Sequence, residues 1–359
     1  MAEEKFAFES NKVSIAFTLS SLLGDCVISK KILNATIELA PDCIVDIICV
    51  KEIHKVYAKA FYSDIKNLNL ILLRDPNEFY KNNFQKYDLA FYVSGSGMVV
   101  VDHFNDQKLL ALAPPLFQAT VQIKEYYKEN VKKIGSAGAV YLRNYALSRI
   151  LNKNCYDILS CNGALPIRDN KIPIQLLPKY KPEFDALKLN NYITIYSDIE
   201  RTTTRPKLKT WPMRYLVEYV ARMKKLLPTV EIIQCGGERD AEIENVDRHF
   251  LGVDLELTKY ILANSLLNVG SEGGLVHLAT ALGTKCLVLF GFTPVSYYGY
   301  NQNINLVSGV CSPCINVVEN GSGRTCMRGA KEPPCMLSHT PELVCEITCT
   351  YLKKFGLEK

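Results

Sequence analysis

Glycines, an acidic residue and a histidine lie close together in residues 268–300, NVGSEGGLVHLATALGTKCLVLFGFTPVSYYGY. This order predicts a strand, a glycine loop, a helix and another strand, with Glu272, Gly273 and Gly274 where the first strand gives way to the helix. Glycines there let the backbone approach a ligand, and the free N–H groups of the helix's first turn attract an anion such as a diphosphate. Glu272 could accept hydrogen bonds from sugar hydroxyls, and His277 could support a phosphate or pack inside the protein. Because many strand-to-helix turns use glycine for geometry alone, this loop by itself does not establish a ligand.

A second group of reactive side chains stands near the end of the sequence. Cys311, Cys314, Cys326 and Cys335 follow the spacing C-x2-C-x11-C-x8-C. Four thiolates in that order could hold zinc or iron tetrahedrally, and a gap of two residues suits a pair of ligands on one metal. The alternatives are reduced thiols in a loop or a disulfide. In each case we expect a structural role.

Strand-like and helix-like stretches alternate along the chain in two series. The first has the strands VSIAFTL, IVDIICV, LILLR and YDLAFYV, a helix from about Asp25, and a long helical stretch at residues 115–152. After a segment punctuated by prolines, the second has the strands YITIYS, VEIIQC, LLNVG and CLVLFG, with helices at MRYLVEYVARMKKLL, ENVDRHF, LELTKYILANS and LVHLATAL. Both series predict a doubly wound α/β domain with a mostly parallel sheet, whose sites lie on strand-to-helix loops.

The domain boundaries follow from these patterns. We place the first domain at residues 1–165, the interdomain linker at 166–189, the second domain at 190–340 with a cysteine-rich loop at 311–335, and a terminal helix at 341–359. Two such domains would face each other across a cleft.

Composition excludes several classes of protein. A length of 359 residues favours two domains, and 48% hydrophobic with 22% charged residues is typical of folded globular proteins. The net charge of +5 is spread along the chain and is too mild to indicate nucleic-acid binding. The sequence shows no apolar run long enough for a transmembrane segment and no signal peptide, so we expect a cytoplasmic location, with peripheral attachment to the inner membrane left open. Seven of the thirteen cysteines fall in apparent core segments and are interpreted as buried small hydrophobes.

The glycine loop resembles the bacterial heptosyltransferases, glycosyltransferase family 9. The resemblance rests on the order acidic residue, small residue, Gly, Leu, any residue, His, followed by Ala-Leu-Gly-Thr and Phe-Gly-x-Thr. It implies two Rossmann-like domains in the arrangement called GT-B, and transfer of heptose from an ADP-sugar with inversion and without a catalytic metal or other cofactor. The family usually has Asp where this chain has Glu272.

Three further segments extend the resemblance. SSLLGDCVIS resembles the family's loop after the first strand, which implies that Asp25 is the general base and that Ser21 and Gly24 lie at the acceptor. KTWPMRYLVEYV resembles the segment whose lysine contacts the donor phosphate, here Lys209. CGGERDAE resembles the loop that carries an acidic residue to the nucleotide ribose, either Glu238 or Asp240.

The chemistry of an inverting transfer gives these residues roles. A base must take the proton of the acceptor hydroxyl as that oxygen attacks the anomeric carbon. The departing diphosphate gains negative charge, so cationic groups and N–H donors around it stabilise the transition state more than the ground state. The donor-binding candidates are Thr203, Thr204, Lys209, Glu238, Asp240, Glu272, Gly273, Gly274, Leu275, His277 and Thr293.

Simpler interpretations exist for each candidate. An Asp after a first strand often caps the next helix, a lysine is usually exposed, and a helical histidine is usually packed. The resemblance implies a lipopolysaccharide core or another surface glycan or glycolipid as acceptor. A protein acceptor is the alternative, because similar cysteine stretches occur in protein-modifying relatives, some of which bind iron. A degenerate member that binds a nucleotide-sugar without turnover is a third possibility.

Overall fold

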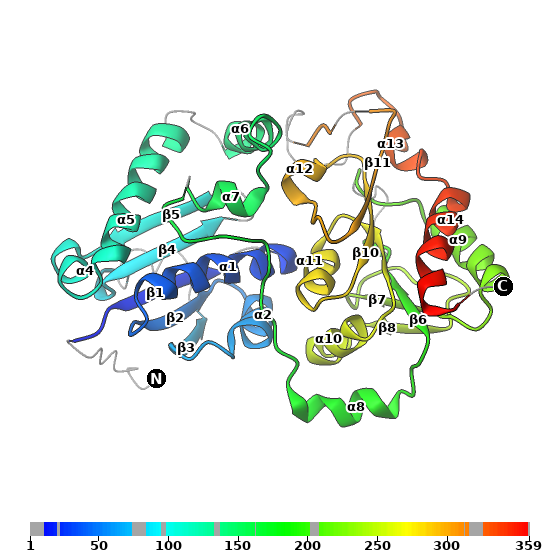
Figure 1. Cartoon of the computed structure of the whole chain (residues 1–359), viewed down its shortest axis with the longest axis horizontal. Coiled ribbons are helices and arrows are strands. Elements are labelled where there is room, and N and C mark those ends of the chain that lie inside the picture. Colours follow the sequence, from blue (N-terminus) through cyan, green and yellow to red (C-terminus); the bar gives the residue numbers. More distant parts are fainter. Residues whose placement is uncertain are drawn as a thin grey trace. The chain divides into compact units, whose positions relative to one another are not determined.

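The chain forms two compact units in this computed structural model, Met1–Ile172 and Pro173–Lys359 (Figure 1). The structure describes residues 11–19, 22–73, 84–94, 98–132, 137–161, 163–201, 208–311, 313–315 and 326–357. The division between the units falls inside the linker predicted at 166–189. Each unit contains one sheet, as the alternating pattern predicted.

The sheet of the first unit has the strand order β3-β2-β1-β4-β5. Its strands are β1 (Ser14–Leu19), β2 (Ile44–Cys49), β3 (Leu68–Leu73), β4 (Leu89–Ser94) and β5 (Met98–Phe104). The first four are parallel, and helices connect β1 to β2 and β2 to β3. β5 pairs antiparallel with β4, with Leu89 opposite Phe104, and forms the edge of the sheet. The sheet is therefore mixed, and the prediction missed β5.

The helices of the first unit accompany these strands. They are α1 (Leu23–Leu39), α2 (Glu52–Tyr62), α4 (Asp106–Leu112), α5 (Pro114–Tyr127), α6 (Ala137–Ile150) and α7 (Cys155–Leu159), with the short helical segments η1 (Phe84–Lys86) and η2 (Lys128–Lys132). The helical stretch predicted at residues 115–152 is thus divided into α5, η2 and α6. α1 and α2 pack against each other, and the buried Lys30 of α1 pairs with Asp64 at 2.7 Å.

The sheet of the second unit is parallel, with the order β11-β10-β9-β6-β7-β8. Its strands are β6 (Tyr192–Ile195), β7 (Glu231–Gly236), β8 (Arg248–Leu251), β9 (Asn268–Ser271), β10 (Cys286–Phe290) and β11 (Ile304–Val307). The chain builds β7 and β8 outward from β6, returns to β9 on the other side of β6, and continues in the opposite direction. This is the doubly wound order of a Rossmann-like domain, and its direction switches between β6 and β9.

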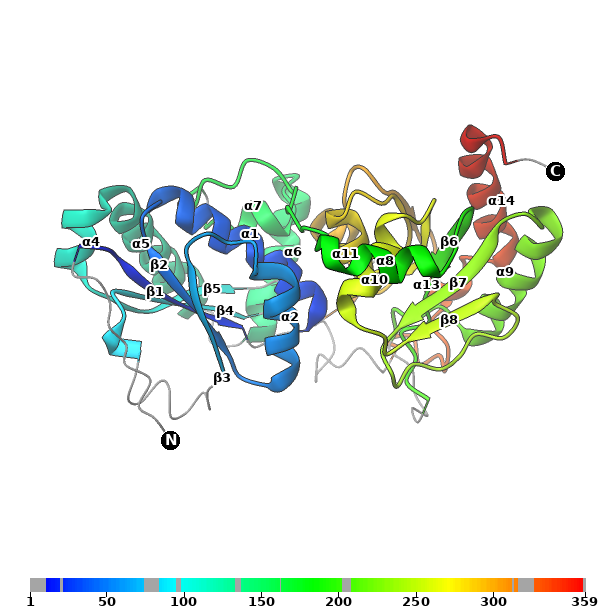
Figure 2. The same ribbon diagram turned by 90° about the horizontal axis from the view of Figure 1, so that it is seen from below.

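Helices cover both faces of this second sheet (Figure 2). They are α8 (Lys181–Ala186), α9 (Met213–Leu226), α10 (Leu255–Ala263), α11 (Gly274–Ala281), α12 (Val295–Tyr298), α13 (Pro334–Leu337) and α14 (Pro341–Leu352), with η3 (Pro178–Tyr180) and η4 (Lys353–Phe355). On one face Ile193 and Ile195 pack with α9 and α14, and on the other Tyr192 packs with α10. The predicted terminal helix is α14, and Cys345 and Cys349 on it pack against α9 rather than binding a ligand.

Two elements of the second unit differ from the prediction. The segment ENVDRHF was predicted as a helix, but Arg248–Leu251 forms β8, paired with β7. β11 was not predicted. Both strands lie at the edges of the sheet and are only partly buried, so they lack the continuous apolar run that identifies a buried strand.

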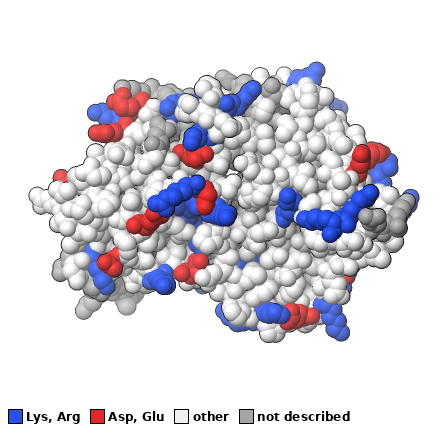
Figure 3. Space-filling model, viewed as in Figure 1, with Lys and Arg blue, Asp and Glu red and all other residues white. Residues whose placement is uncertain are grey.

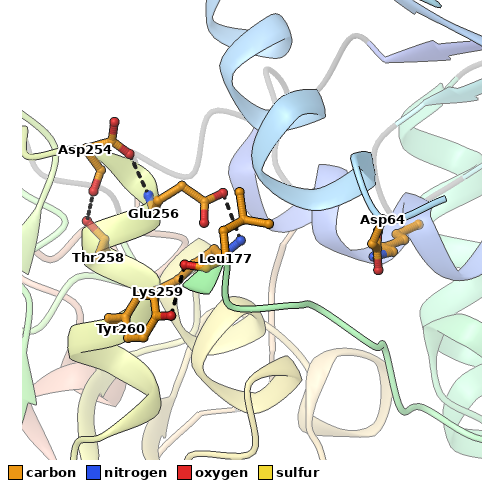
Figure 4. A network of polar contacts seen from close by, with 8 residues as sticks. Asp64, Leu177, Asp254, Glu256, Thr258, Lys259 and Tyr260 are labelled. Carbon is orange, nitrogen blue, oxygen red and sulfur yellow. Dashed lines mark hydrogen bonds and ion pairs between the residues drawn. The ribbon is translucent and has the colours of Figure 1, made fainter. Parts of the chain in front are cut away.

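Polar contacts join the start of the second unit to α10 (Figure 4). The hydroxyl of Tyr260 donates to the carbonyl of Leu177 at 3.0 Å, and the Tyr260 ring stacks on Phe184 of α8. On the same helix the buried Lys259 pairs with Glu256 at 3.0 Å. These contacts explain why the segment after Pro173 belongs to the second unit.

The surface carries charges of both signs in small groups, with much uncharged area on the face shown in Figure 3. This agrees with a net charge of +5 from 42 basic and 37 acidic residues. Over the part of the chain that the structure describes, no helix combines the length and apolar character needed to cross a bilayer.

Candidate functional site

The ends of β6 and β9 meet where the second sheet changes direction, which is where open α/β sheets bind ligands. Tyr196 directly follows β6, and its buried ring lies against Gly270 of β9. A Cβ on Gly270 would stand 2.3 Å from Cε1 of Tyr196, so only glycine fits there. The Tyr196 hydroxyl also donates to the carbonyl of Ser271. Tyr196 therefore fixes the loop that carries Glu272, a role that the sequence analysis missed.

Glu272 lies at the centre of the candidate site, with a cation or a ring nitrogen beside each carboxylate oxygen. Nζ of Lys209 is 3.4 Å from Oε2, and Nε2 of His277 is 3.5 Å from Oε1. Glu272 and His277 are almost fully buried, whereas Lys209 keeps 22% of its side chain exposed. The structure thus brings Lys209 beside Glu272 and His277, which the sequence analysis had taken from a separate segment.

The ionisation of Glu272 follows from these neighbours. Burial alone would raise the pKa of the carboxyl, but the ammonium of Lys209 and the ring of His277 outweigh burial and lower the pKa to about 2. Glu272 is therefore a carboxylate at neutral pH. A buried carboxylate can accept hydrogen bonds from a polyhydroxyl ligand without a change in protonation.

Trp211 anchors the loop that carries Lys209. Its backbone N–H donates to Oγ of Ser271 at 3.1 Å, and its indole N–H donates to the carbonyl of His339 at 2.8 Å. The ring lies in the core against Tyr219 of α9. Because the Trp211 backbone is tied to the end of β9, the lysine two residues earlier is held near Glu272.

The start of α11 is the second feature of the site. Gly273 is its N-cap in extended backbone, and a Cβ there would lie 3.9 Å from Nζ of Lys209. The Lys209 ammonium therefore lies next to the N-terminus of α11, where the first-turn N–H groups are. Gly274 and Leu275 of this turn are half-buried. A diphosphate is the kind of ligand that a helix N-terminus with a lysine beside it attracts.

Tyr300 extends the network behind His277 and was not predicted. Its hydroxyl is 2.6 Å from Nδ1 of His277, and both residues are buried. The predicted Thr293 is also buried, after β10. Among the described residues, the hydroxyls of Thr293 and Thr210 have no hydrogen-bond partner. Contacts across 23 residues, such as that between His277 and Tyr300, leave no periodic signal in the sequence.

Glu238 and Asp240 both lie in the loop after β7, but their carboxylates have different surroundings. Asp240 accepts a hydrogen bond from the N–H of Gly237 at 2.9 Å and so holds its own loop. Glu238 is exposed at the same edge of the sheet. Of the two carboxylates proposed for the ribose, that of Glu238 is the more accessible.

Asp25 lies in the first turn of α1, in the first unit, and is half-buried. It follows β1, which is next to β4 at the point where the first sheet changes direction. Its carbonyl accepts from Ser29 at 2.7 Å, and Gly24 beside it is buried. The N-cap of α1 is Leu22, so Asp25 does not cap this helix, although a carboxylate in the first turn interacts favourably with the helix dipole. The predicted Ser21, Thr203 and Thr204 lie outside the described residues.

The four cysteines from Cys311 to Cys335 line one pocket of about 380 Å³. Burial and the neighbouring thiols raise the pKa of Cys335 to about 11. Within the described ranges, no three His, Cys, Asp or Glu side chains are arranged to hold a metal. As they lie, these side chains are not arranged as ligands of one metal, so the metal predicted from the spacing stays a prediction, and we derive no step through it. The described residues include all thirteen cysteines, and none of them forms a disulfide.

This pocket adjoins the candidate site through the backbone. Leu208 and Phe292 also line it, and they directly precede Lys209 and Thr293. The N–H of Cys314 donates to the carbonyl of Phe292 at 3.1 Å. The cysteine-rich loop therefore supports two of the segments that carry site residues.

Comparison with known proteins agrees with the fold. Residues 177–322 match the family Glycosyltransferase family 9 (heptosyltransferase). No curated protein matches the chain. Among solved structures, ADP-heptose lipopolysaccharide heptosyltransferase II of E. coli is similar with a TM-score of 0.58 at 15% identity, over 96% of this chain and 100% of that one. A family 9 glycosyltransferase of Veillonella parvula has a TM-score of 0.58 at 14% identity, over 97% of this chain and 99% of that one.

A third solved structure is the iron-containing dodecameric heptosyltransferase TibC of enterotoxigenic E. coli, bound to ADP-D-beta-D-heptose. Its TM-score is 0.59 at 11% identity, over 96% of this chain and 77% of that one. The two α/β sheets are those of the GT-B fold of these heptosyltransferases. Residues 177–322 thus match glycosyltransferase family 9, and the fold of the chain is that of the heptosyltransferases.

Proposed function

We propose that the protein transfers a heptose, with inversion, from an ADP-heptose donor to a hydroxyl of a lipopolysaccharide core or related surface glycan. The observation that carries the donor site is the buried Glu272 carboxylate held between Lys209 and His277 at the start of α11. In this proposal the first-turn N–H groups of α11 and Lys209 bind the diphosphate, and Glu272 accepts hydrogen bonds from sugar hydroxyls. Glu238 contacts the ribose.

The transfer step exchanges one C–O bond for another. The acceptor oxygen attacks the anomeric carbon, the bond from that carbon to the diphosphate oxygen breaks, and Asp25 takes the acceptor proton. The leaving diphosphate gains negative charge, which the Lys209 ammonium and the α11 N–H groups stabilise. The proposal requires no metal or other cofactor for this step.

The relatives support the choice of donor. The similar E. coli protein is an ADP-heptose heptosyltransferase, and TibC was solved in complex with ADP-heptose. A protein acceptor is the second candidate function, because four cysteines line one pocket here and the similar TibC is iron-containing. A cytoplasmic location with peripheral contact to the inner membrane is part of the proposal, and cell fractionation tests it.

Thermal shift with nucleotide-sugars tests the donor site directly. ADP-, GDP-, UDP- and CMP-sugars and the free nucleotides are compared on the wild type, Lys209→Ala and Glu272→Ala. A ligand that binds only the folded state raises the melting temperature. We expect a shift with the ADP class that both variants lose. No shift with any class would overturn the donor assignment and favour a degenerate member of the family.

Turnover with two acceptors then distinguishes the candidate functions. Heptose-deficient lipopolysaccharide core and an unglycosylated surface protein are each offered with ADP-heptose, and the products are analysed by mass spectrometry. We expect the added mass on the glycan. Addition to the protein alone would support the second candidate, and donor binding without product would indicate loss of catalysis.

A further inference from the structure

Tyr300 is held rigidly behind the candidate donor site. It lies between α12 and β11 with 2% of its surface exposed, and Nδ2 of Asn305 donates to its carbonyl at 2.9 Å. Its ring meets that of His277 edge-on, with centroids 5.5 Å apart and an interplanar angle of 69°. Its hydroxyl is 2.6 Å from Nδ1 of His277. The opposite ring nitrogen, Nε2, faces Oε1 of Glu272 at 3.5 Å.

The two nitrogens of a neutral imidazole cannot both donate. One carries the proton and the other presents a lone pair. If the proton were on Nδ1, the lone pair of Nε2 would point at the Glu272 carboxylate, which is repulsive. If the Tyr300 hydroxyl donates to Nδ1, the proton must be on Nε2, where it points at the carboxylate.

We propose that Tyr300 is a positioning residue that selects the Nε2–H tautomer of His277 and thereby fixes the orientation of the Glu272 carboxylate. The inference rests on the proposed function, in which Glu272 binds the donor sugar. It assigns Tyr300 a part in recognising the sugar and none in binding the nucleotide.

The burial of the three residues explains why one hydroxyl matters. Tyr300, His277 and Glu272 are each no more than 5% exposed, so water is poorly placed to replace a lost partner. Lys209, the other partner of Glu272, keeps 22% of its side chain exposed, and a long lysine side chain orients a carboxylate less firmly than a packed ring does. The direction of Glu272 therefore depends on His277 and, through it, on Tyr300.

Tyr300→Phe removes the hydroxyl and keeps the ring. We expect the dissociation constant of ADP-heptose to rise about five- to tenfold, the amount that one buried hydrogen bond contributes, while that of ADP changes less than twofold. Tyr219→Phe is the matched control, because it removes the hydroxyl of a buried tyrosine that contacts Thr348 at 3.1 Å in the core of the same unit. Both variants should lose stability, but only Tyr300→Phe should lose preference for the sugar-bearing ligand.

Glutamine at position 277 provides a second test. A Gln amide has N–H groups that can donate to Glu272 whatever Tyr300 does. In the His277→Gln background, Tyr300→Phe should therefore change the ADP-heptose constant less than twofold. An undiminished five- to tenfold effect there would show that Tyr300 does not act through His277, and would overturn the proposal.

The tautomer can be measured without any ligand. Nitrogen-15 spectra of the histidine rings distinguish Nε2–H from Nδ1–H, and His277→Gln identifies the signal among the five histidines. We expect the Nε2–H form in the wild type and a mixture or the Nδ1–H form in Tyr300→Phe. The Nδ1–H form or a doubly protonated ring in the wild type, or the same tautomer in both proteins, would overturn the inference. If the spectra agree with it but the wild type binds no ADP-heptose, the proposed function fails and the tautomer selection stands.

Discussion

The ammonium of Lys209 lies 3.4 Å from Oε2 of Glu272, a residue 63 positions later in the chain. Lys209 comes from the loop before α9 and Glu272 from the end of β9, and Trp211 ties the two segments together through Ser271. This contact keeps a buried carboxylate ionised beside the N-terminus of α11. Its consequences for stability and for ligand binding can be measured separately.

The low pKa of Glu272 predicts a pH dependence of stability. A carboxyl whose pKa falls from 4.5 to about 2 on folding stabilises the folded state fully above pH 4.5, and this contribution disappears as the pH falls toward 2. It amounts to at most about 3 kcal/mol, at 1.36 kcal/mol per pKa unit. We expect the difference in unfolding free energy between wild type and Glu272→Gln to shrink between pH 4.5 and 2, measured by urea denaturation. A constant difference over this range would contradict the assignment.

Asp25→Asn should reduce kcat by about 10² to 10⁴, because the amide cannot accept the acceptor proton. Donor affinity should stay unchanged, since Asp25 lies in the first unit. Steady-state kinetics and donor titration measure the two effects. Glu38→Gln is the control on the same helix, where an exposed carboxylate pairs with Arg168. A kcat within tenfold of wild type for Asp25→Asn would leave Asp25 only its interaction with the dipole of α1.

Gly270→Ala should destabilise the second unit by about 1–3 kcal/mol, because the new Cβ would collide with the buried ring of Tyr196. The displaced ring would also move the loop with Glu272, so we expect weaker donor binding. Gly309→Ala is the control, because a Cβ there meets nothing within 4 Å. Scanning calorimetry measures the melting temperature, and titration calorimetry measures donor binding. Equal melting temperatures for the two variants would refute the close packing of Tyr196.

The loop after β7 allows its two acidic residues to be compared. Glu238→Gln should weaken binding of ADP several-fold with little effect on stability, because its exposed carboxylate is the one placed to reach a ribose. Asp240→Ala should instead cost about 1 kcal/mol of stability, since its carboxylate accepts from Gly237. Titration and thermal denaturation of both variants provide the measurement. The reverse pattern would assign the ribose to Asp240.

Metal binding by the cysteine-rich loop, which the sequence predicts, remains to be measured. Four thiols around one pocket should take up one zinc or iron per chain if their side chains turn inward, because a cation offsets the mutual repulsion of neighbouring thiolates. Elemental analysis of protein purified with a reducing agent measures this, and Cys311→Ser with Cys314→Ser should abolish it. Cys345→Ser, in the core on α14, is the control. Metal-free wild type that keeps its melting temperature with chelator would contradict the prediction.

The local pattern was sufficient for the buried parts of the fold. The parallel strands β1, β2, β6, β7 and β10 have mostly buried side chains, so each appears in the sequence as a short apolar run. The strands that the prediction missed, β5, β8 and β11, all lie at sheet edges. Their partial exposure permits polar residues such as Arg248 and His249, and their pairing depends on a neighbour that the local sequence does not contain.

The candidate site, too, could be predicted from the sequence only in part. The sequence by itself determined which residue types could do chemistry, because Glu272 and His277 stand beside a predicted strand end and glycines, and Lys209 stands in a segment that resembles the family. Only the tertiary structure placed Tyr196 on Gly270 and Tyr300 on His277. The order of strands in the sheet and the packing of side chains behind it decide such contacts. Between residues 75 positions apart, such as Tyr196 and Ser271, no helical or strand periodicity connects the partners, so the folded chain alone brings them together.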